Sequence, residues 1–247
     1  MIRIYKANIV RLVKNGFFLI GCALAFLLTL LAVKHKMDNI LTFLAGGGPD
    51  IIMFFMSAAM VAFFTIFTVI FSNVEYSNGV IRNKITAGYS QTQIYLTHYL
   101  THLTAALIML VFHILGGVIG GARFDAYIFK AYVAFMVSLF AYIAAVNAIA
   151  MRLKKIVFAI VASMLLLNAA FNLLMFGNLI LSILEGKALM IGSAIYNITP
   201  LGQWFVYTGF ADDAANPGFA VQIIISIILI TVATFLGLIK INKRDLV

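Results

Sequence analysis

The sequence has few acidic residues, a single cysteine and little charge of either sign. Only 8 of its 247 residues are Asp or Glu, against 17 Lys or Arg. Charged residues make up 10% of the chain and hydrophobic residues 64%, with a mean hydropathy of +1.09. A soluble domain of this length could not hide that much apolar surface from water. The composition therefore predicts an integral membrane protein.

The single cysteine, Cys22, excludes a disulfide framework. The four residues 19–22, LIGC, are similar to a lipoprotein cleavage box. However, Lys14 leaves too few apolar residues before them for the apolar region of a signal peptide. We therefore expect this first apolar segment to remain in the mature protein.

Acidic residues are absent from the middle of the apolar runs. The acids that fall between runs or at their ends are Asp38, Asp50, Glu75, Asp125, Glu185, Asp212, Asp213 and Asp245. Ion-coupled carriers usually need carboxylates or broken helices at the membrane midplane. This distribution argues against transport driven by protons or sodium.

Motifs of enzymes are missing as well. The chain has no His-Glu-x-x-His and no Gly-x-Ser-x-Gly, which disfavours an intramembrane enzyme. It also has no P-loop, since its one Gly-Lys pair, Gly186-Lys187, is followed by Ala188 and lacks the upstream glycine. If the chain moves a substrate uphill, another polypeptide must supply the energy.

Apolar runs of about 20 residues, the length that a helix needs to cross hydrocarbon, recur along the chain. They predict an all-α fold with six transmembrane helices in one membrane domain, residues 1–247. The predicted spans are 16–33, 51–71, 98–121, 127–150, 156–181 and 220–239.

An even number of spans puts both termini on one side, and the basic residues indicate which side. With the N-terminus inside, 12 of the 17 Lys and Arg fall in inner segments. This excess predicts cytoplasmic termini. The net charge of +9 then favours contact with anionic membrane lipids and no nucleic acid.

Residues 1–15 have helical periodicity and two different faces. The apolar face holds Ile2, Tyr5, Ile9, Leu12 and Val13, and the other holds Arg3, Lys6, Arg11 and Lys14. The pattern predicts an amphipathic helix along the inner interface, with its cations toward lipid phosphates. A basic flank that only sets orientation is the alternative.

The longest outer segment, 182–219, contains a second helix signal. Thr199-Pro200 is typical of a helix start, and the residues after it are apolar and aromatic. We expect a short helix at the outer interface, anchored by Trp204 and Tyr207.

Small and polar residues within the spans predict close helix packing. Gly116 with Gly120, and Gly117 with Gly121, form overlapping small-xxx-small pairs. Asn168 and Asn172 lie one turn apart and are expected to hydrogen-bond across helices. Lining a substrate path is the alternative for these polar residues.

Three histidines share one face of the third span. His98 and His102 have the spacing of a zinc-binding pair, but His113 lies about 16 Å further along the axis. The pattern offers them no acidic or cysteine ligand. We predict no metal site and a polar face turned toward the bundle interior.

A polar segment, 72–90, separates the second and third spans on the inner side. Ser77-Asn78-Gly79 can start a helix of about three turns, and Gly88 can end it in the left-handed conformation. Ser90 and Gln93 have capping-box spacing and predict the start of the third helix.

This short helix is predicted to expose Ile81 and Ile85 beside Arg82 and Lys84. Exposed apolar residues framed by cations favour a surface that docks another protein. A lipid-facing interfacial helix is the alternative.

The segments EYSNGVIRNKI, from Glu75, and AGYSxxQIYL, from Ala87, closely resemble the segment after the second span in type-2 ABC exporter permeases. Bacterial permeases for bacitracin resistance, lantibiotic immunity and peptide export are the most similar. The resemblance extends over the basic N-terminal helix, six spans, long last outer segment and short basic tail. Gln91 departs from it, since the family often has a basic residue there.

The resemblance implies that 72–90 carries a cytoplasmic coupling helix seated on a separate ATPase subunit. Its implied contacts are Glu75, Gly79, Ile81, Arg82, Lys84 and Ile85. The working unit would hold two ATPases, which bind ATP and Mg, and a second permease, identical or homologous. It would export an apolar or amphipathic peptide or antibiotic across the bacterial cell membrane. A non-transporting membrane assembly or sensor protein that holds a cytoplasmic partner through 72–90 is the alternative.

Overall fold

The computed structural model describes residues 1–35, 48–153, 155–211, 215–239 and 241, and within them it is helical with no strand. Six stretches are long and apolar enough to cross a membrane, which confirms the all-α prediction and makes the chain a multi-pass membrane protein. They are α2 (Gly16–Lys34), α4 with α5 (Pro49–Phe55 and Ala58–Ser77), α7 (Gln91–Gly120), α8 (Ala126–Arg152), α9 (Ile156–Leu181) and α12 (Phe219–Leu238).

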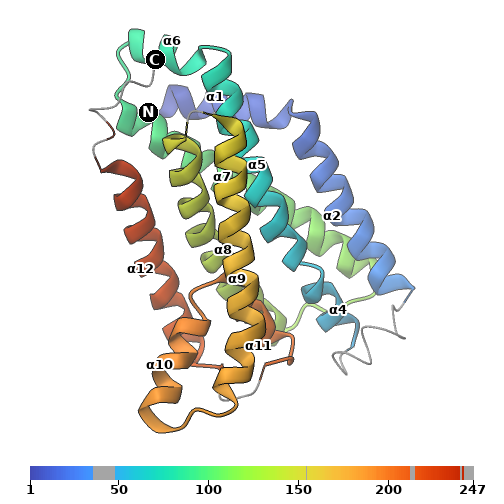
Figure 1. Ribbon diagram of the computed structural model, residues 1–247. Coiled ribbons are helices and arrows are strands. Elements are labelled where there is room, and N and C mark those ends of the chain that lie inside the picture. The colour runs from blue at the N-terminus through green and yellow to red at the C-terminus, as the bar shows by residue number, and fades with distance from the viewer. Residues whose placement is uncertain (36–47, 154, 212–214, 240, 242–247) are drawn as a thin grey trace.

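The shorter helices lie at the two ends of the bundle (Figure 1). At one end are α1 (Ile2–Val13) and α6 (Val80–Thr86), and at the other are α10 (Gly186–Tyr196) and α11 (Pro200–Tyr207). Most of α8 is buried at the centre, whereas most of α9 and α12 face outward. Ile241, just past α12, packs near Ile4 of α1, so the chain begins and leaves its last long helix on the same side.

The second span is longer than predicted and is built from two helices. It covers 49–77 and is interrupted by a turn at Met56 and Ser57, whereas the hydrophobic pattern predicted one run over 51–71. Because α5 continues to Ser77, the start of the polar segment is helical. This extension places Glu75 inside the last turns of a long helix.

Glycines bring α7 into close contact with its neighbours. A Cβ on Gly116 would lie 2.3 Å from the carbonyl oxygen of Phe26 in α2, and one on Gly117 would lie 2.2 Å from Sδ of Met53. Gly120 faces Val33 of α2 in the same way, at 2.9 Å. Neighbouring backbone and side chains can approach α7 this closely only where a side chain is absent from it.

Gly121 was predicted as a packing residue, but it has a different role. It ends α7 in the left-handed conformation, with a φ of 108°, and a Cβ there would meet nothing within 4 Å. The small-residue spacing therefore identified three packing glycines and one helix cap.

The segment 182–219 holds two helices where the pattern predicted one. The predicted start at Thr199-Pro200 is confirmed, since Thr199 Oγ1 accepts from the backbone N–H of Gly202 at 3.2 Å. Trp204 and Tyr207, however, are buried and do not stand free at an outer interface. Trp204 Nε1 donates to the Phe55 carbonyl at 3.1 Å, because a buried indole N–H needs an acceptor.

Candidate functional site

The polar segment after α5 folds into a tight and ordered corner. Gly79 has a φ of 68° and starts α6, which is seven residues long and thus shorter than the three turns predicted. Gly88 has the predicted left-handed φ, at 86°. The capping box at the start of α7 is confirmed, with Ser90 accepting from Gln93 N–H and Gln93 Oε1 accepting from Ser90 N–H.

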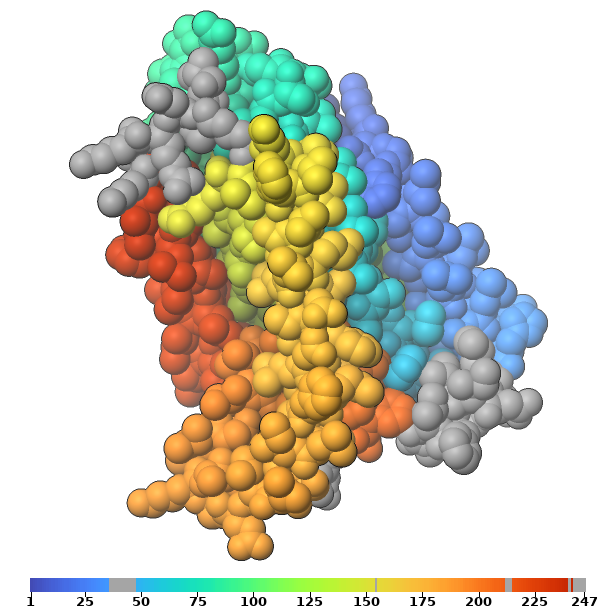
Figure 2. All heavy atoms as spheres, in the orientation of Figure 1, coloured from blue at the N-terminus to red at the C-terminus, as the bar shows by residue number. Residues whose placement is uncertain are grey.

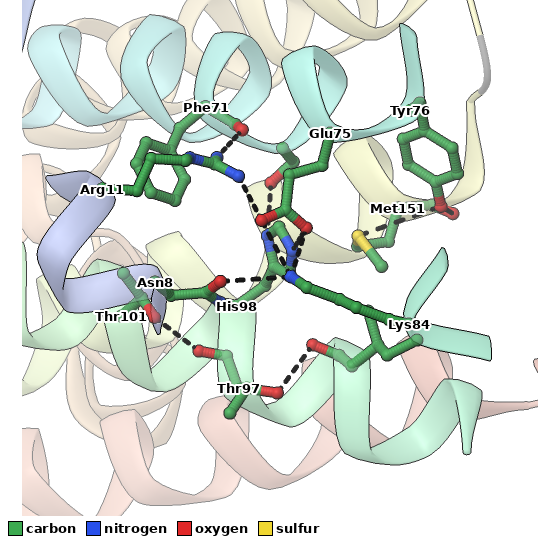
Figure 3. A network of polar contacts seen from close by, with 12 residues as sticks. Asn8, Arg11, Phe71, Glu75, Tyr76, Lys84, Thr97, His98, Thr101 and Met151 are labelled. Carbon is green, nitrogen blue, oxygen red and sulfur yellow. Dashed lines mark hydrogen bonds and ion pairs between the residues drawn. The ribbon is translucent and has the colours of Figure 1, made fainter. Parts of the chain in front are cut away.

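The buried carboxylate of Glu75 lies next to this corner, on its side toward the bundle. Glu75 is 1% exposed, and both of its oxygens accept from Lys84 Nζ, at 2.8 and 2.6 Å. Nε2 of His98 lies 2.7 Å from Glu75 Oε2. Arg11 also donates to this carboxylate, as Figure 3 shows.

Further bonds fasten the two cations of this charge cluster, which comprises Arg11, Glu75, Lys84 and His98. Arg11 donates to the carbonyl of Phe71 and lies over its ring, 3.7 Å from the centroid. Lys84 Nζ also donates to Asn8 Oδ1 at 3.1 Å. Four helices therefore meet at one carboxylate: α1, α5, α6 and α7 (Figure 3).

Burial and the neighbouring carboxylate shift the pKa values of the two cations in the charge cluster in opposite directions. Burial lowers the pKa of Lys84, and the neighbouring Glu75 carboxylate opposes this effect. Burial likewise lowers the pKa of Arg11, against the attraction of Glu75. Because each charge is costly to bury alone, the carboxylate and its cations stabilise the site only together.

The histidines extend the network into the bundle. Ser72 Oγ lies 3.3 Å from His98 Nδ1 and 3.3 Å from His102 Nε2. The sequence pattern offered these histidines no acidic neighbour, but Glu75 reaches His98 from α5. In the part of the chain that the structure describes, no group of three potential ligands lies together to hold a metal.

His113 belongs to a separate polar chain in the bundle. It lies 2.8 Å from Thr29 Oγ1 and 2.9 Å from the hydroxyl of Tyr132. These bonds join α2, α7 and α8 through one imidazole, whose two ring nitrogens both have partners.

A small apolar cluster packs against the buried side of α6. Ile81 is 1% exposed and belongs to a cluster made of Ile4, Ile81, Ile94, Tyr95, Met151 and Ile241. The prediction that Ile81 is exposed for docking is therefore wrong. Ile85 is half-buried and packs against the same cluster.

The face of α6 that remains accessible is polar. Arg82, Asn83 and Thr86 are exposed, and we call these three residues the α6 outer face. Of the predicted coupling residues on this helix, Arg82 alone is exposed. Glu75, Ile81 and Lys84 hold α6 in place, and Gly79 shapes its turn.

The N-terminal helix is amphipathic in a different register from the one predicted. Ile4, Asn8 and Leu12 form its buried side, while Ile2 is 71% exposed. Arg11 was placed with the lipid-facing cations, but it points inward to Glu75. Arg11 lies on the inner side of the helix because it pairs with the buried carboxylate of Glu75, which the division into apolar and basic faces did not take into account.

Among the residues that the structure describes, Asn168 and Asn172 bond to each other and to no other helix. Both are exposed on α9, and Asn172 Nδ2 donates to Asn168 Oδ1 at 2.7 Å and to the Asn168 carbonyl at 2.9 Å. The prediction of a bond across helices is thus wrong for the single chain.

An apolar cleft of about 320 Å³ opens between α8, α9 and α12. Ala145, Leu173 and Val232 are among the residues that line it, and Tyr142 and Thr199 supply its few polar groups. Such a surface suits an apolar group rather than an ion.

Comparison with protein-family models, curated proteins and solved structures finds no match for this chain. What the chain does must therefore be inferred from its own residues, chiefly from the charge cluster and the α6 outer face.

Proposed function

We propose that this chain is the permease subunit of an ATP-driven ABC exporter in the bacterial cell membrane. It would move an apolar or amphipathic substrate, a peptide or an antibiotic, outward. The resemblance of 75–96 to type-2 exporter permeases suggests the family. The observation that carries the proposal is the fastening of α6 to three other helices through Glu75 and Lys84.

The docking part of the proposal rests on how α6 is held. A short helix can pass a movement on to the membrane-spanning helices only if it is held firmly against them. Lys84 ties α6 to Glu75 by two hydrogen bonds, and Ile81 is embedded in the apolar cluster below. The polar α6 outer face then remains free for a cytoplasmic ATPase that binds ATP and Mg.

A force applied to α6 would act directly on membrane-spanning helices. Glu75 belongs to α5 and His98 to α7, so a displacement of Lys84 acts on two spanning helices at once. Arg11 adds the N-terminal helix to the same junction. ATP binding by the partner would shift the permease between two arrangements because the partner binds them with different affinity.

The apolar cleft is consistent with the proposed substrate class. Its lining favours an apolar chain or ring. Within the described helices, no carboxylate lies at mid-span to couple transport to an ion.

The proposal predicts a neighbouring gene for a stand-alone P-loop ATPase, and co-expression with that ATPase tests it. The tagged permease should co-purify this ATPase and stimulate its ATP hydrolysis. Arg82→Glu reverses the charge of the α6 outer face without touching the buried residues, so it should lose the ATPase. Lys14→Glu, an equal charge change at the exposed end of α1, is the matched control and should retain it.

Two results would count against the exporter. The first is a permease that binds no ATPase, and the second is an Arg82→Glu variant that binds it as well as the wild type. In either case the alternative gains support, namely a membrane assembly or sensor protein that holds a different cytoplasmic partner through the same segment.

A further inference from the structure

Methionine gathers at the place where α2, the second span and α7 meet. Figure 2 shows α2, coloured blue, beside the cyan atoms of α4 and α5 on one flank of the molecule. A cavity of about 180 Å³ lies between these helices and α7, and three of its 11 lining residues are Met56, Met60 and Met109. An even spread of 11 methionines over 247 residues would place fewer than one there. We call this space the thioether cavity.

Two pairs of potential metal ligands line the thioether cavity, each from a different span. Met56 lies at the turn that interrupts the second span, and Met60 lies in the first turn of α5. Met109 and His113 are four residues apart on α7, so they share one face of that helix. Met60 and Met109 are each 2% exposed, and His113 is 1% exposed. The donors are therefore held between the helices of the bundle.

The imidazole of His113 can offer a nitrogen to this cavity. Its Nε2 lies 2.9 Å from the hydroxyl of Tyr132, and its Nδ1 lies 2.8 Å from Thr29 Oγ1. If Nε2 carries the proton and donates to Tyr132, Nδ1 keeps a lone pair. Thr29 also lines the cavity, and its hydroxyl can turn to a carbonyl of its own helix, as Thr65 does toward Val61 at 2.7 Å. Nδ1 is then free for a cation, while Tyr132 keeps the ring in place.

The types of ligand present decide which ion would fit. Among the described residues, no three of His, Cys, Asp and Glu lie together, so the usual ligand set of zinc is absent there. The lining of the thioether cavity also contains no carboxylate to balance a double charge, and an unbalanced buried charge is costly. Neutral thioethers select Cu(I), whereas Mg and Ca prefer oxygen ligands. The chemistry therefore favours a soft ion with a single charge.

We propose that the three methionines of the thioether cavity bind one Cu(I) ion, and that Nδ1 of His113 is its fourth ligand. Ag(I) has the same charge and is also soft, so it would occupy the same place. The alternative is that the methionines only fill irregular space between helices, which flexible thioethers do well. Leucine fills such space with little loss but holds no metal, so Met→Leu exchange separates binding from packing. The inference goes beyond the proposed function, since it needs neither ATP nor an ATPase.

Metal titration of the purified full-length chain tests the site. Cys22 is the only cysteine, and its thiol could hold a soft ion by itself, so the parent and all variants carry Cys22→Ala. The probes are Ag(I), which needs no reductant, and Cu(I) kept reduced with ascorbate. We expect one ion bound per chain, and a higher unfolding temperature with the ion than without it, because the ion binds the folded chain. X-ray absorption of the copper form should show sulfur neighbours.

Met60→Leu with Met109→Leu removes two ligands at nearly constant volume. Without metal, this double variant should unfold close to the temperature of the parent, and it should bind no ion. The matched control is Met175→Leu with Met190→Leu, which removes two exposed thioethers from α9 and α10 and should bind one ion. If the double variant fails to fold, the single variants Met60→Leu and Met109→Leu replace it, and each should bind more weakly than the parent.

Thr29→Val tests the fourth ligand. It removes the hydroxyl that competes for Nδ1 of His113, and should strengthen binding about fivefold, the value of one hydrogen bond. Unchanged or weaker binding would exclude His113 from the site. The metal site as a whole is overturned if the parent binds no ion, or if the cavity variants and the control bind equally. None of these outcomes depends on whether an ATPase binds α6.

Discussion

Lys84 Nζ donates hydrogen bonds to both oxygens of Glu75, at 2.6 Å to Oε2 and 2.8 Å to Oε1. The two residues are nine positions apart, one near the end of a spanning helix and the other in a helix of two turns. Their pair closes the corner between α5 and α6. The carboxylate also accepts a hydrogen bond from Arg11 and is hydrogen-bonded to His98. The position of α6 therefore depends on three other helices.

Removing the charge of Glu75 should destabilise the corner. In Glu75→Gln, Lys84 and Arg11 lose the carboxylate that compensates their burial. We expect a loss of about 2 kcal/mol in the free energy of unfolding, below the range for fully buried pairs because the Arg11 side chain is 29% exposed. Thermal unfolding in detergent measures this. Glu185→Gln, at an exposed residue, should have no effect, and equal behaviour of the two variants would contradict the account.

Stability should depend on alkaline pH through Lys84. Burial lowers the pKa of this residue in the folded chain from the ordinary value of 10.5. Between the folded pKa and 10.5 the unfolded chain therefore binds more protons, so stability rises with pH in that window. Unfolding curves over this range should show the rise in wild type and lose it in Lys84→Met. A rise of the same size in both proteins would rule out Lys84 as its source.

Adding a methyl group at two adjacent glycines of α7 should have unequal effects. In Gly116→Ala the new Cβ meets the backbone carbonyl of Phe26, which cannot move without shifting α2. In Gly117→Ala it meets the flexible side chain of Met53. We expect Gly116→Ala to cost about 2 kcal/mol and Gly117→Ala to cost less. Thermal unfolding compares them, and the reverse order would show that α2 and α7 are not packed as described.

The end of the bundle that carries α10 and α11 has a polar network that depends on Gln222. This side chain accepts from the hydroxyl of Tyr207 at 2.9 Å and donates to Asn197 Oδ1 at 2.9 Å. Gln222→Leu leaves the hydroxyl of Tyr207 and Oδ1 of Asn197 without these partners, and should reduce the free energy of unfolding by about 2 kcal/mol. Thr231→Val, at an exposed residue of the same helix, is the control. A neutral Gln222→Leu would show that the network adds nothing to stability.

Local patterns predicted much of the fold. Runs of apolar residues sufficed for the spans because hydrocarbon requires a helix of a certain length and leaves few alternatives. The capping box at Ser90 and the start at Thr199 were also predictable, since each depends on residues within one turn.

Contacts between distant residues were beyond reach of the same patterns. Arg11 and Glu75 are 64 positions apart, and neither has a local feature that identifies the other. The exposure of Ile81 was predicted wrongly because a helix of seven residues has too few turns to show which side is apolar. The burial of Trp204 likewise depends on the carbonyl of Phe55, on a different helix.

The asparagines of α9 illustrate a third limit. Their spacing predicted that they lie on one side of a helix, and they do. Which side faces the bundle depends on how the neighbouring helices pack, and no periodicity in α9 alone determines it. The structure turns Asn168 and Asn172 outward, away from the other helices of their own chain.

Site-specific photocrosslinking from the α6 outer face tests the central claim most directly. A photoreactive amino acid at Asn83, which is exposed and outside the charge cluster, would capture whatever seats on α6 in living cells. The same probe at Lys14 is the control. The account predicts an adduct with a P-loop ATPase from Asn83 and none from Lys14. An adduct from Asn83 that lacks a P-loop, or no adduct at all, would contradict the exporter.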